Sequence, residues 1–206
     1  MSYFELFDLP VRFAVDGEAL ETAYRKVQAE VHPDRFASAP EAERRRALEL
    51  ATEANEAFQT LRSPVARARY LLQLRGIDTQ EETNTAMPVD FLMAQMEWRE
   101  AVADARAASD VEGLEQLAAA VRADRDELVA ALVRSLDVTQ EYDVAALGVR
   151  KLRFLDKLDQ EIGDAIESLL FATPEGNLMT EDPRQTKLDL KPIAVETKEL
   201  KQINAA

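Results

Sequence analysis

The tripeptide His32-Pro33-Asp34 lies between two stretches of sequence with helical periodicity. Pro33 has no backbone N–H and its ring clashes with a preceding helical turn, so a helix cannot run through it. The proline also disfavours the α conformation at His32. The chain is therefore expected to end one helix, form a rigid corner and begin another. This predicts a helical hairpin with the tripeptide at its tip.

Apolar residues on both sides of this corner recur at the spacing of a buried helical stripe. The upstream stripe follows a candidate N-cap at Asp16 and consists of Leu20, Ala23, Tyr24, Val27 and Val31. The downstream stripe has Pro40 in its first turn and consists of Ala47, Leu48, Ala51, Asn55, Phe58 and Leu61. The apolar opening from Tyr3 to Leu9 predicts a two-turn helix that covers the face shared by the hairpin helices.

The rest of the chain divides into segments of different character. Ser63 and Pro64 read as N-cap and first residue of a further helix, which Gly76 closes. Residues 76–88 predict a connector because their periodicity is weak. Residues 89–171 hold three helical blocks, at about 89–108, 110–136 and 138–171, and the short breaks between them predict an antiparallel three-helix bundle. Sparse apolar residues and several prolines predict a flexible tail at residues 172–206. The expected fold is all-α, with residues 1–75 forming the first domain.

Charge separates the two modules. Residues 1–75 have a net charge of −1, residues 76–171 of −12 and residues 172–206 of −1. The acidic module should repel nucleic acid and anionic lipid and favour a basic partner, although an acidic surface can also serve solubility alone. The chain has no Cys, no secretory signal pattern and no apolar run of membrane-spanning length. We expect a soluble cytoplasmic protein that binds neither nucleic acid nor membrane.

The sequence offers little for catalysis. His32 and Asp34 could pair as a base and its orienting group, but Pro33 between them predicts that their side chains diverge. There is no phosphate-binding loop, no dinucleotide fingerprint and no nucleophile elbow. His32 is the only histidine, which argues against a metal site, and carboxylate pairs are common by chance in so acidic a chain. We expect no enzymatic activity, no metal and no cofactor.

In this context the tripeptide resembles the signature of a J-domain. Tyr24-Arg25-Lys26 precedes it on a helix, Arg35-Phe36 follows it, and an Ala-rich helix comes after the loop. The resemblance implies binding to an ATP-loaded chaperone of the DnaK class and stimulation of its ATPase. It assigns the stimulating contact to His32, Pro33 and Asp34. It assigns electrostatic docking to Arg25, Lys26 and Arg35. Val31 departs from the family pattern, since many J-domains have Tyr there.

A narrower resemblance, to the HscB-type co-chaperones of iron–sulfur cluster biogenesis, spans both modules. It rests on Ser2–Phe7, His32–Phe36, Gln59–Pro64, Arg69–Leu72, Phe91–Met93 and Arg150–Leu158. It implies two partners, an HscA-type chaperone and an IscU-type scaffold protein that the C-terminal bundle binds and delivers. The alternative is a general J-domain co-chaperone that delivers unfolded clients.

A candidate surface for the scaffold lies on the first bundle helix. Apolar and acidic residues recur there at helical spacing, namely Leu92, Met93, Met96, Glu97, Glu100 and Asp104. Phe154 joins them because it lies about 200° round its helix from Leu152, off the core stripe. An alternative reading places Leu92 and Met96 in the core, where Met often fills gaps.

Overall fold

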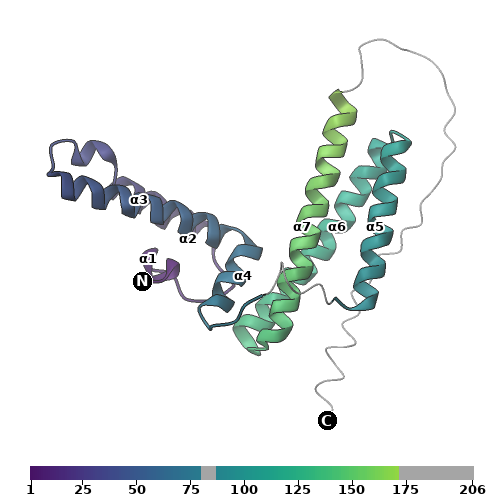
Figure 1. Ribbon diagram of the computed structural model, residues 1–206, viewed down its shortest axis with the longest axis horizontal. Coiled ribbons are helices and arrows are strands. Elements are labelled where there is room, and N and C mark those ends of the chain that lie inside the picture. Colours follow the sequence, from purple (N-terminus) through teal and green to yellow (C-terminus); the bar gives the residue numbers. More distant parts are fainter. Residues whose placement is uncertain (80–86, 172–206) are drawn as a thin grey trace. The chain divides into compact units, whose positions relative to one another are not determined.

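The computed structural model describes residues 1–79 and 87–171, and within these residues every regular element is helical (Figure 1). The all-α prediction is confirmed. The elements are α1 Tyr3–Leu6, α2 Gly17–Glu30, the 3₁₀ turn η1 Pro33–Phe36, α3 Glu41–Arg62, α4 Pro64–Gln73, α5 Val89–Ala107, α6 Val111–Val133, the π-helical turn η2 Arg134–Val138 and α7 Tyr142–Phe171. The expected tail at 172–206 and most of the expected connector lie outside the described residues.

Local sequence signals account for the ends of the N-terminal helices. Asp16 caps α2 by accepting hydrogen bonds from the backbone N–H groups of Glu18 and Ala19. Ser63 caps α4 in the same way. Gly76 closes α4 with a φ of +73°, a conformation that glycine adopts without strain. Each cap satisfies backbone groups that a helix end would otherwise leave unpaired.

Helices α2 and α3 form the predicted hairpin. The Tyr24 ring stacks on Phe58 with centroids 4.2 Å apart, and the Tyr24 hydroxyl donates to Asn55 Oδ1 at 2.6 Å. The α1 segment covers the hairpin with Phe4 and Phe7, both buried, as expected. The prediction that Leu48 belongs to the buried stripe is wrong, because its side chain is 67% exposed. The buried face of α3 instead consists of Ala47, Ala54, Ala57, Phe58 and Leu61.

The described residues group into two compact units that cut across the boundaries expected from the sequence. The first unit combines residues 1–79 with 128–153, and the second combines 87–127 with 154–171. Residues of the C-terminal segment therefore share a core with the hairpin, among them Leu132, Leu136, Ala145, Val149 and Leu152. The unequal lengths of the helices explain why residues of the C-terminal segment pack in the first unit. At 1.5 Å per residue, α7 with 30 residues is about 45 Å long and α5 with 19 residues about 28 Å. The apolar part of α7 that α5 does not accompany needs another partner.

A carboxylate secures this first unit. The π-helical turn η2 carries Asp137, whose two oxygens accept hydrogen bonds from the backbone N–H groups of Phe13 at 2.6 Å and Ala14 at 2.8 Å. The guanidinium of Arg67 lies over the Phe13 ring, 4.8 Å from its centroid. Burial lowers the pKa of Arg67, and the negative charge of Asp137 acts in the opposite direction. The break expected at Asp137 lies two residues later, because helical structure continues to Val138.

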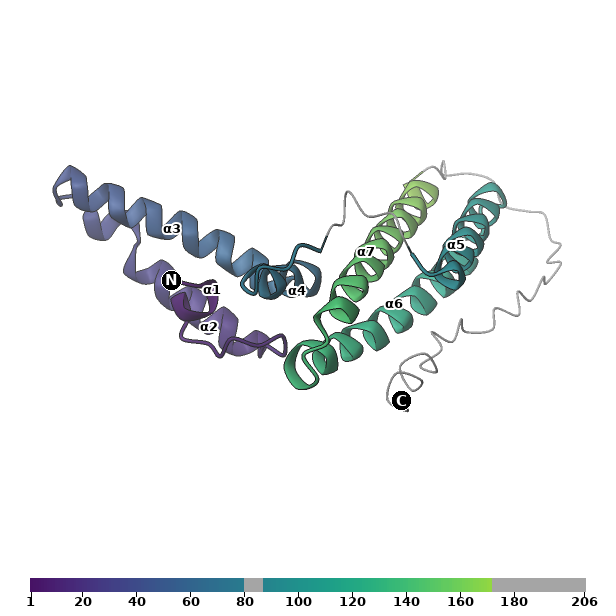
Figure 2. The same ribbon diagram turned by 60° about the horizontal axis from the view of Figure 1, so that its bottom comes forward.

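The second unit packs α5, α6 and the C-terminal part of α7 as neighbouring helices (Figures 1 and 2). Its buried residues include Ala94, Trp98, Val102, Leu114, Leu117, Val121, Leu158 and Ile162. This arrangement turns one face of α5 inward and leaves the opposite face to solvent.

Candidate functional site

The His-Pro-Asp corner is solvent-exposed at the end of the α2–α3 hairpin. Helix α2 ends at Glu30, Val31 is buried as its C-cap, and His32 adopts an extended ψ of 132° before the 3₁₀ turn that begins at Pro33. The backbone N–H of Arg35 donates to the His32 carbonyl at 3.0 Å, which closes the turn. The side chains of His32 and Asp34 are 59% and 91% exposed. The corner is thus ordered by its backbone and open to a partner.

The two polar side chains of the corner converge, so the prediction that they diverge is wrong. His32 Nδ1 lies 3.5 Å from Asp34 Oδ2 and accepts a hydrogen bond from the Asp34 backbone N–H at 3.3 Å. His32 is the N-cap of the 3₁₀ turn, and the hydrogen bond from the Asp34 N–H to its ring places the imidazole beside the Asp34 carboxylate, an effect that the proline rule alone does not capture. With Nδ1 as acceptor, the neutral imidazole carries its hydrogen on Nε2, which leaves that N–H as a donor.

The three predicted docking cations are all exposed, but they are engaged differently. Arg25 forms an ion pair with Glu21 at 3.8 Å within α2. Arg35 donates to the backbone carbonyl of Ala29 at 3.2 Å and so caps the end of α2. Lys26 has no carboxylate within 4.0 Å among the residues that the structure describes. Their proposed contact with a chaperone stays a prediction.

The candidate scaffold surface lies on the outward face of α5. Leu92, Met93 and Met96 are 41%, 56% and 72% exposed, which excludes the alternative that Leu92 and Met96 are core residues. The acidic residues predicted beside them, Glu97, Glu100 and Asp104, are exposed as well. The core face of the same helix is formed by Ala94, Trp98 and Val102. Sequence reasoning missed Val89, which is 69% exposed and extends the apolar surface by one turn.

Phe154 was expected off the core stripe of its helix, and its side chain is partly buried. Its ring packs edge-on against Phe91 with centroids 5.7 Å apart, and the guanidinium of Arg99 lies 5.6 Å from its centroid. Phe154 therefore borders the α5 surface from α7 instead of projecting alone.

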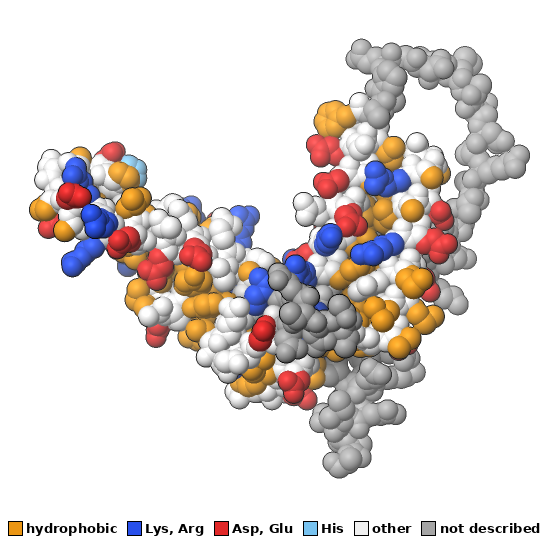
Figure 3. Space-filling view, viewed as in Figure 1, with side chains coloured by type: hydrophobic (Ala, Val, Ile, Leu, Met, Phe, Trp, Pro, Cys, Tyr) orange, Lys and Arg blue, Asp and Glu red, His pale blue; other side chains and the backbone are white. Residues whose placement is uncertain are grey.

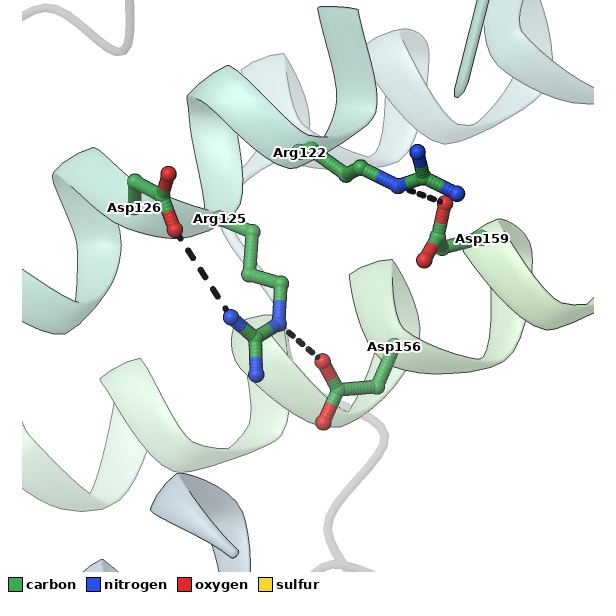
Figure 4. Close-up of a pocket in the computed structure, with 5 residues that line it drawn as sticks. All are labelled: Arg122, Arg125, Asp126, Asp156 and Asp159. Atoms are coloured by element: carbon green, nitrogen blue, oxygen red, sulfur yellow. Dashed lines mark hydrogen bonds and ion pairs between the residues drawn. The ribbon is translucent and has the colours of Figure 1, made fainter. Parts of the chain in front are cut away.

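The second unit also has an open polar depression between α6 and α7 (Figure 4). Arg125 Nε donates to Asp156 at 2.6 Å, and Arg122 Nε donates to Asp159 at 2.9 Å. Because each guanidinium already has a carboxylate partner, we interpret these pairs as ties between two helices. Within residues 1–79 and 87–171 no group of three or more metal-ligating side chains is gathered, and no helix is both long and apolar enough to cross a membrane.

A short first helix and a hairpin with an exposed His-Pro-Asp corner define a J-domain co-chaperone. Residues 87–163 match the model of the HSCB C-terminal oligomerisation domain. Co-chaperone protein HscB homologs are similar over most of the chain. The one from Chromobacterium violaceum is 59% identical over 82% of this chain and 95% of its own length. The one from Azoarcus sp. is 52% identical over 81% and 94%. The chain therefore belongs to the HscB family of co-chaperones.

Solved structures of the family have the same fold. Chaperone HscB from Vibrio cholerae aligns with a TM-score of 0.73 at 38% identity, covering 82% of this chain and 99% of that one. Human co-chaperone protein HscB aligns with a TM-score of 0.74 at 28% identity, covering 79% and 81%. The resemblance noted in the sequence is confirmed.

Proposed function

We propose that this protein stimulates the ATPase of an HscA-type chaperone of the DnaK class and delivers an IscU-type iron–sulfur scaffold protein to it. It does so in the cytoplasm, without enzymatic activity of its own, and aids cluster transfer to acceptor proteins. The observation that carries the proposal is the exposed, backbone-ordered corner at His32–Asp34. Membership of the HscB family supports it.

The corner is suited to bind the chaperone and stimulate its ATPase. Its backbone is already fixed by Pro33 and by the bond from Arg35 N–H to the His32 carbonyl, so little conformational entropy is lost on docking. The side chains of His32 and Asp34 remain largely exposed to solvent although they contact each other, so both are accessible to the chaperone. Nearby cations on α2 would speed the encounter with an acidic chaperone surface.

The α5 surface suits a folded partner with an apolar patch and basic groups. Its exposed apolar residues lie beside carboxylates, an arrangement like that of interfaces with an apolar centre and a polar rim. Binding the scaffold on one part of the chain and the chaperone on another raises the effective concentration of scaffold at the chaperone. ATP hydrolysis would then trap the scaffold and favour cluster release.

The first experiment measures steady-state ATP hydrolysis by a purified HscA-type chaperone with increasing amounts of this protein. The wild-type chain should raise the rate, whereas His32→Gln and Asp34→Asn should abolish the increase. Glu43→Gln, which replaces a carboxylate by an amide at an exposed position of α3, is the matched control and should behave as wild type. Circular dichroism checks that each variant is folded. A corner variant that stimulates fully would refute the proposed trigger.

The second experiment measures binding of a purified IscU-type scaffold by calorimetry. Met96→Ala and Leu92→Ala should weaken binding and leave stimulation without scaffold unchanged. Val138→Ala, which removes an equally exposed apolar side chain from the first unit, is the control. A general client-delivering J-domain protein would instead bind an unfolded polypeptide as tightly as the folded scaffold, and equal affinities would overturn the scaffold proposal.

A further inference from the structure

The exposed face of α5 has a different charge on each edge. Helical rotation of about 100° per residue places Met96 about 40° from Leu92, with Glu100 and Asp104 about 80° and 120° from it in the same direction. Arg99 and Arg106 lie about 20° and 40° from Leu92 in the opposite direction. All six of these side chains are exposed. The apolar strip is therefore flanked by carboxylates on one side and by guanidinium groups on the other.

The space-filling view agrees with this division (Figure 3). Acidic side chains line the outer edge of α5, hydrophobic ones gather over its N-terminal part, and basic ones lie on the side towards α7. A surface with charge of one sign would attract an oppositely charged partner but would not favour one orientation of it over another. A surface with two signs favours one orientation over the reverse, because the reversed complex places like charges opposite each other.

The cations on the basic edge are the ones that the second unit leaves without an ion pair. Of the other cations among its described residues, Arg122 pairs with Asp159, Arg125 with Asp156 and Lys157 with Glu161. Within the described part of the chain, neither Arg99 nor Arg106 has a carboxylate within 4.0 Å. In a unit rich in carboxylates, this leaves both charges available to an acidic group from outside.

Arg99 is also held in place. Its guanidinium lies over the Phe154 ring, which in turn packs edge-on against Phe91. A guanidinium stacked on a ring keeps N–H donors in its plane for a carboxylate, and it loses less entropy on binding than a freely moving side chain. Arg99 thus combines the features of a contact residue: exposure, a fixed position and no competing partner.

We propose that Arg99, assisted by Arg106, binds an acidic group of the scaffold protein and fixes the orientation in which the scaffold docks on α5. The inference rests on the proposed function and specifies its partner. The docking surface of the scaffold has a basic part that faces Glu100 and Asp104 and an acidic group that faces Arg99.

The direction in which one substitution changes the affinity for the scaffold tests this inference. Arg99→Glu adds negative charge to the binding face. If the scaffold surface were basic throughout, this change would strengthen binding. If an acidic group faces Arg99, attraction becomes repulsion and binding should weaken about five- to tenfold. Arg134→Glu makes the same charge change at an exposed position of the first unit and measures the long-range effect of net charge alone.

Calorimetry with the purified IscU-type scaffold supplies the readout, and Arg99→Lys should recover part of the lost affinity. The emission maximum of Trp98, the only tryptophan and a buried residue of α5, reports whether each variant keeps its fold. The inference is supported if Arg99→Glu weakens scaffold binding more than Arg134→Glu does. It is overturned if the Arg99→Glu variant binds the scaffold as tightly as the Arg134→Glu variant, or more tightly. If the wild-type chain does not bind the scaffold at all, the proposed function fails as well. If it binds and Met96→Ala weakens binding, a null result at Arg99 refutes the orienting role alone.

Discussion

Replacing Asp137 with Asn keeps the size of this side chain but removes its charge and one of its two acceptor oxygens. In the native chain both oxygens are used, one for the backbone N–H of Phe13 and one for that of Ala14. Asn can satisfy only one of these donors, and its own NH₂ group would face the other. Arg67 would also lose the negative charge beside it.

The cost follows from these contacts. A hydrogen bond to a charged acceptor contributes about 1.5–3 kcal/mol, and a partly buried N–H left without an acceptor costs about 1–3 kcal/mol. These terms overlap, because both describe the same lost bond. We therefore expect Asp137→Asn to lower the free energy of unfolding by about 2–4 kcal/mol.

Urea unfolding followed by far-UV circular dichroism measures this change. With a slope of about 2 kcal/mol per molar urea, the midpoint should fall by about 1–2 M. Asp164→Asn makes the same substitution at an exposed position of α7 and should shift the midpoint by less than about 0.3 M. Similar shifts for the two variants would show that the bonds to Phe13 and Ala14 do not hold the first unit together.

Two further changes test other parts of the structure. Burial, with repulsion from Glu127, raises the pKa of Asp124 to about 6, so its contribution to stability is complete below its ordinary pKa of 3.8 and is lost as the pH rises through 6. Asp124→Asn should therefore raise the free energy of unfolding by about 1 kcal/mol at pH 7 and change it little near pH 4, since the group is partly solvated. A gain in urea unfolding that does not vary with pH would contradict this. Tyr24→Phe removes the hydroxyl bonded to Asn55 and should cost about 1 kcal/mol, whereas Tyr24→Ala also loses the stacking on Phe58 and should cost about 3 kcal/mol. Equal midpoints for the two Tyr24 variants would show that the stacked ring contributes nothing.

Features that depend on neighbouring residues were predicted well from the sequence. The caps at Asp16 and Ser63 and the left-handed Gly76 each follow from interactions within a few residues, and all three are confirmed. The hairpin follows from two periodic stripes and a proline between them. The same local logic predicted the exposure of Leu92 and Met96, because their turns of α5 also carry acidic residues.

Features that depend on distant partners were not predictable in this way. Leu48 lies next to Ala47 in the sequence, and periodicity alone does not decide which of two overlapping stripes faces α2. The role of Asp137 depends on Phe13, more than a hundred residues away, and no local pattern distinguishes it from other surface carboxylates. The sharing of a core between residues 1–79 and 128–153 depends on the unequal lengths of α5 and α7, a comparison between elements.

The structure also separates residues that the sequence placed in one group. Arg25, Lys26 and Arg35 were predicted together as docking cations, yet Arg25 is paired within α2 and Arg35 caps its end, whereas Lys26 is unengaged among the described residues. A charge that already has a partner must give up that interaction before it binds another, so its net contribution to a complex is smaller. By this criterion Lys26 is the best suited to recognition of the three hairpin cations, and Arg99 and Arg106 are the best suited of the second unit's described cations. Lys26 and Arg99 both lie next to surfaces for which partners are proposed. Which cations have a carboxylate partner is decided in the folded chain, and composition and periodicity do not reveal it.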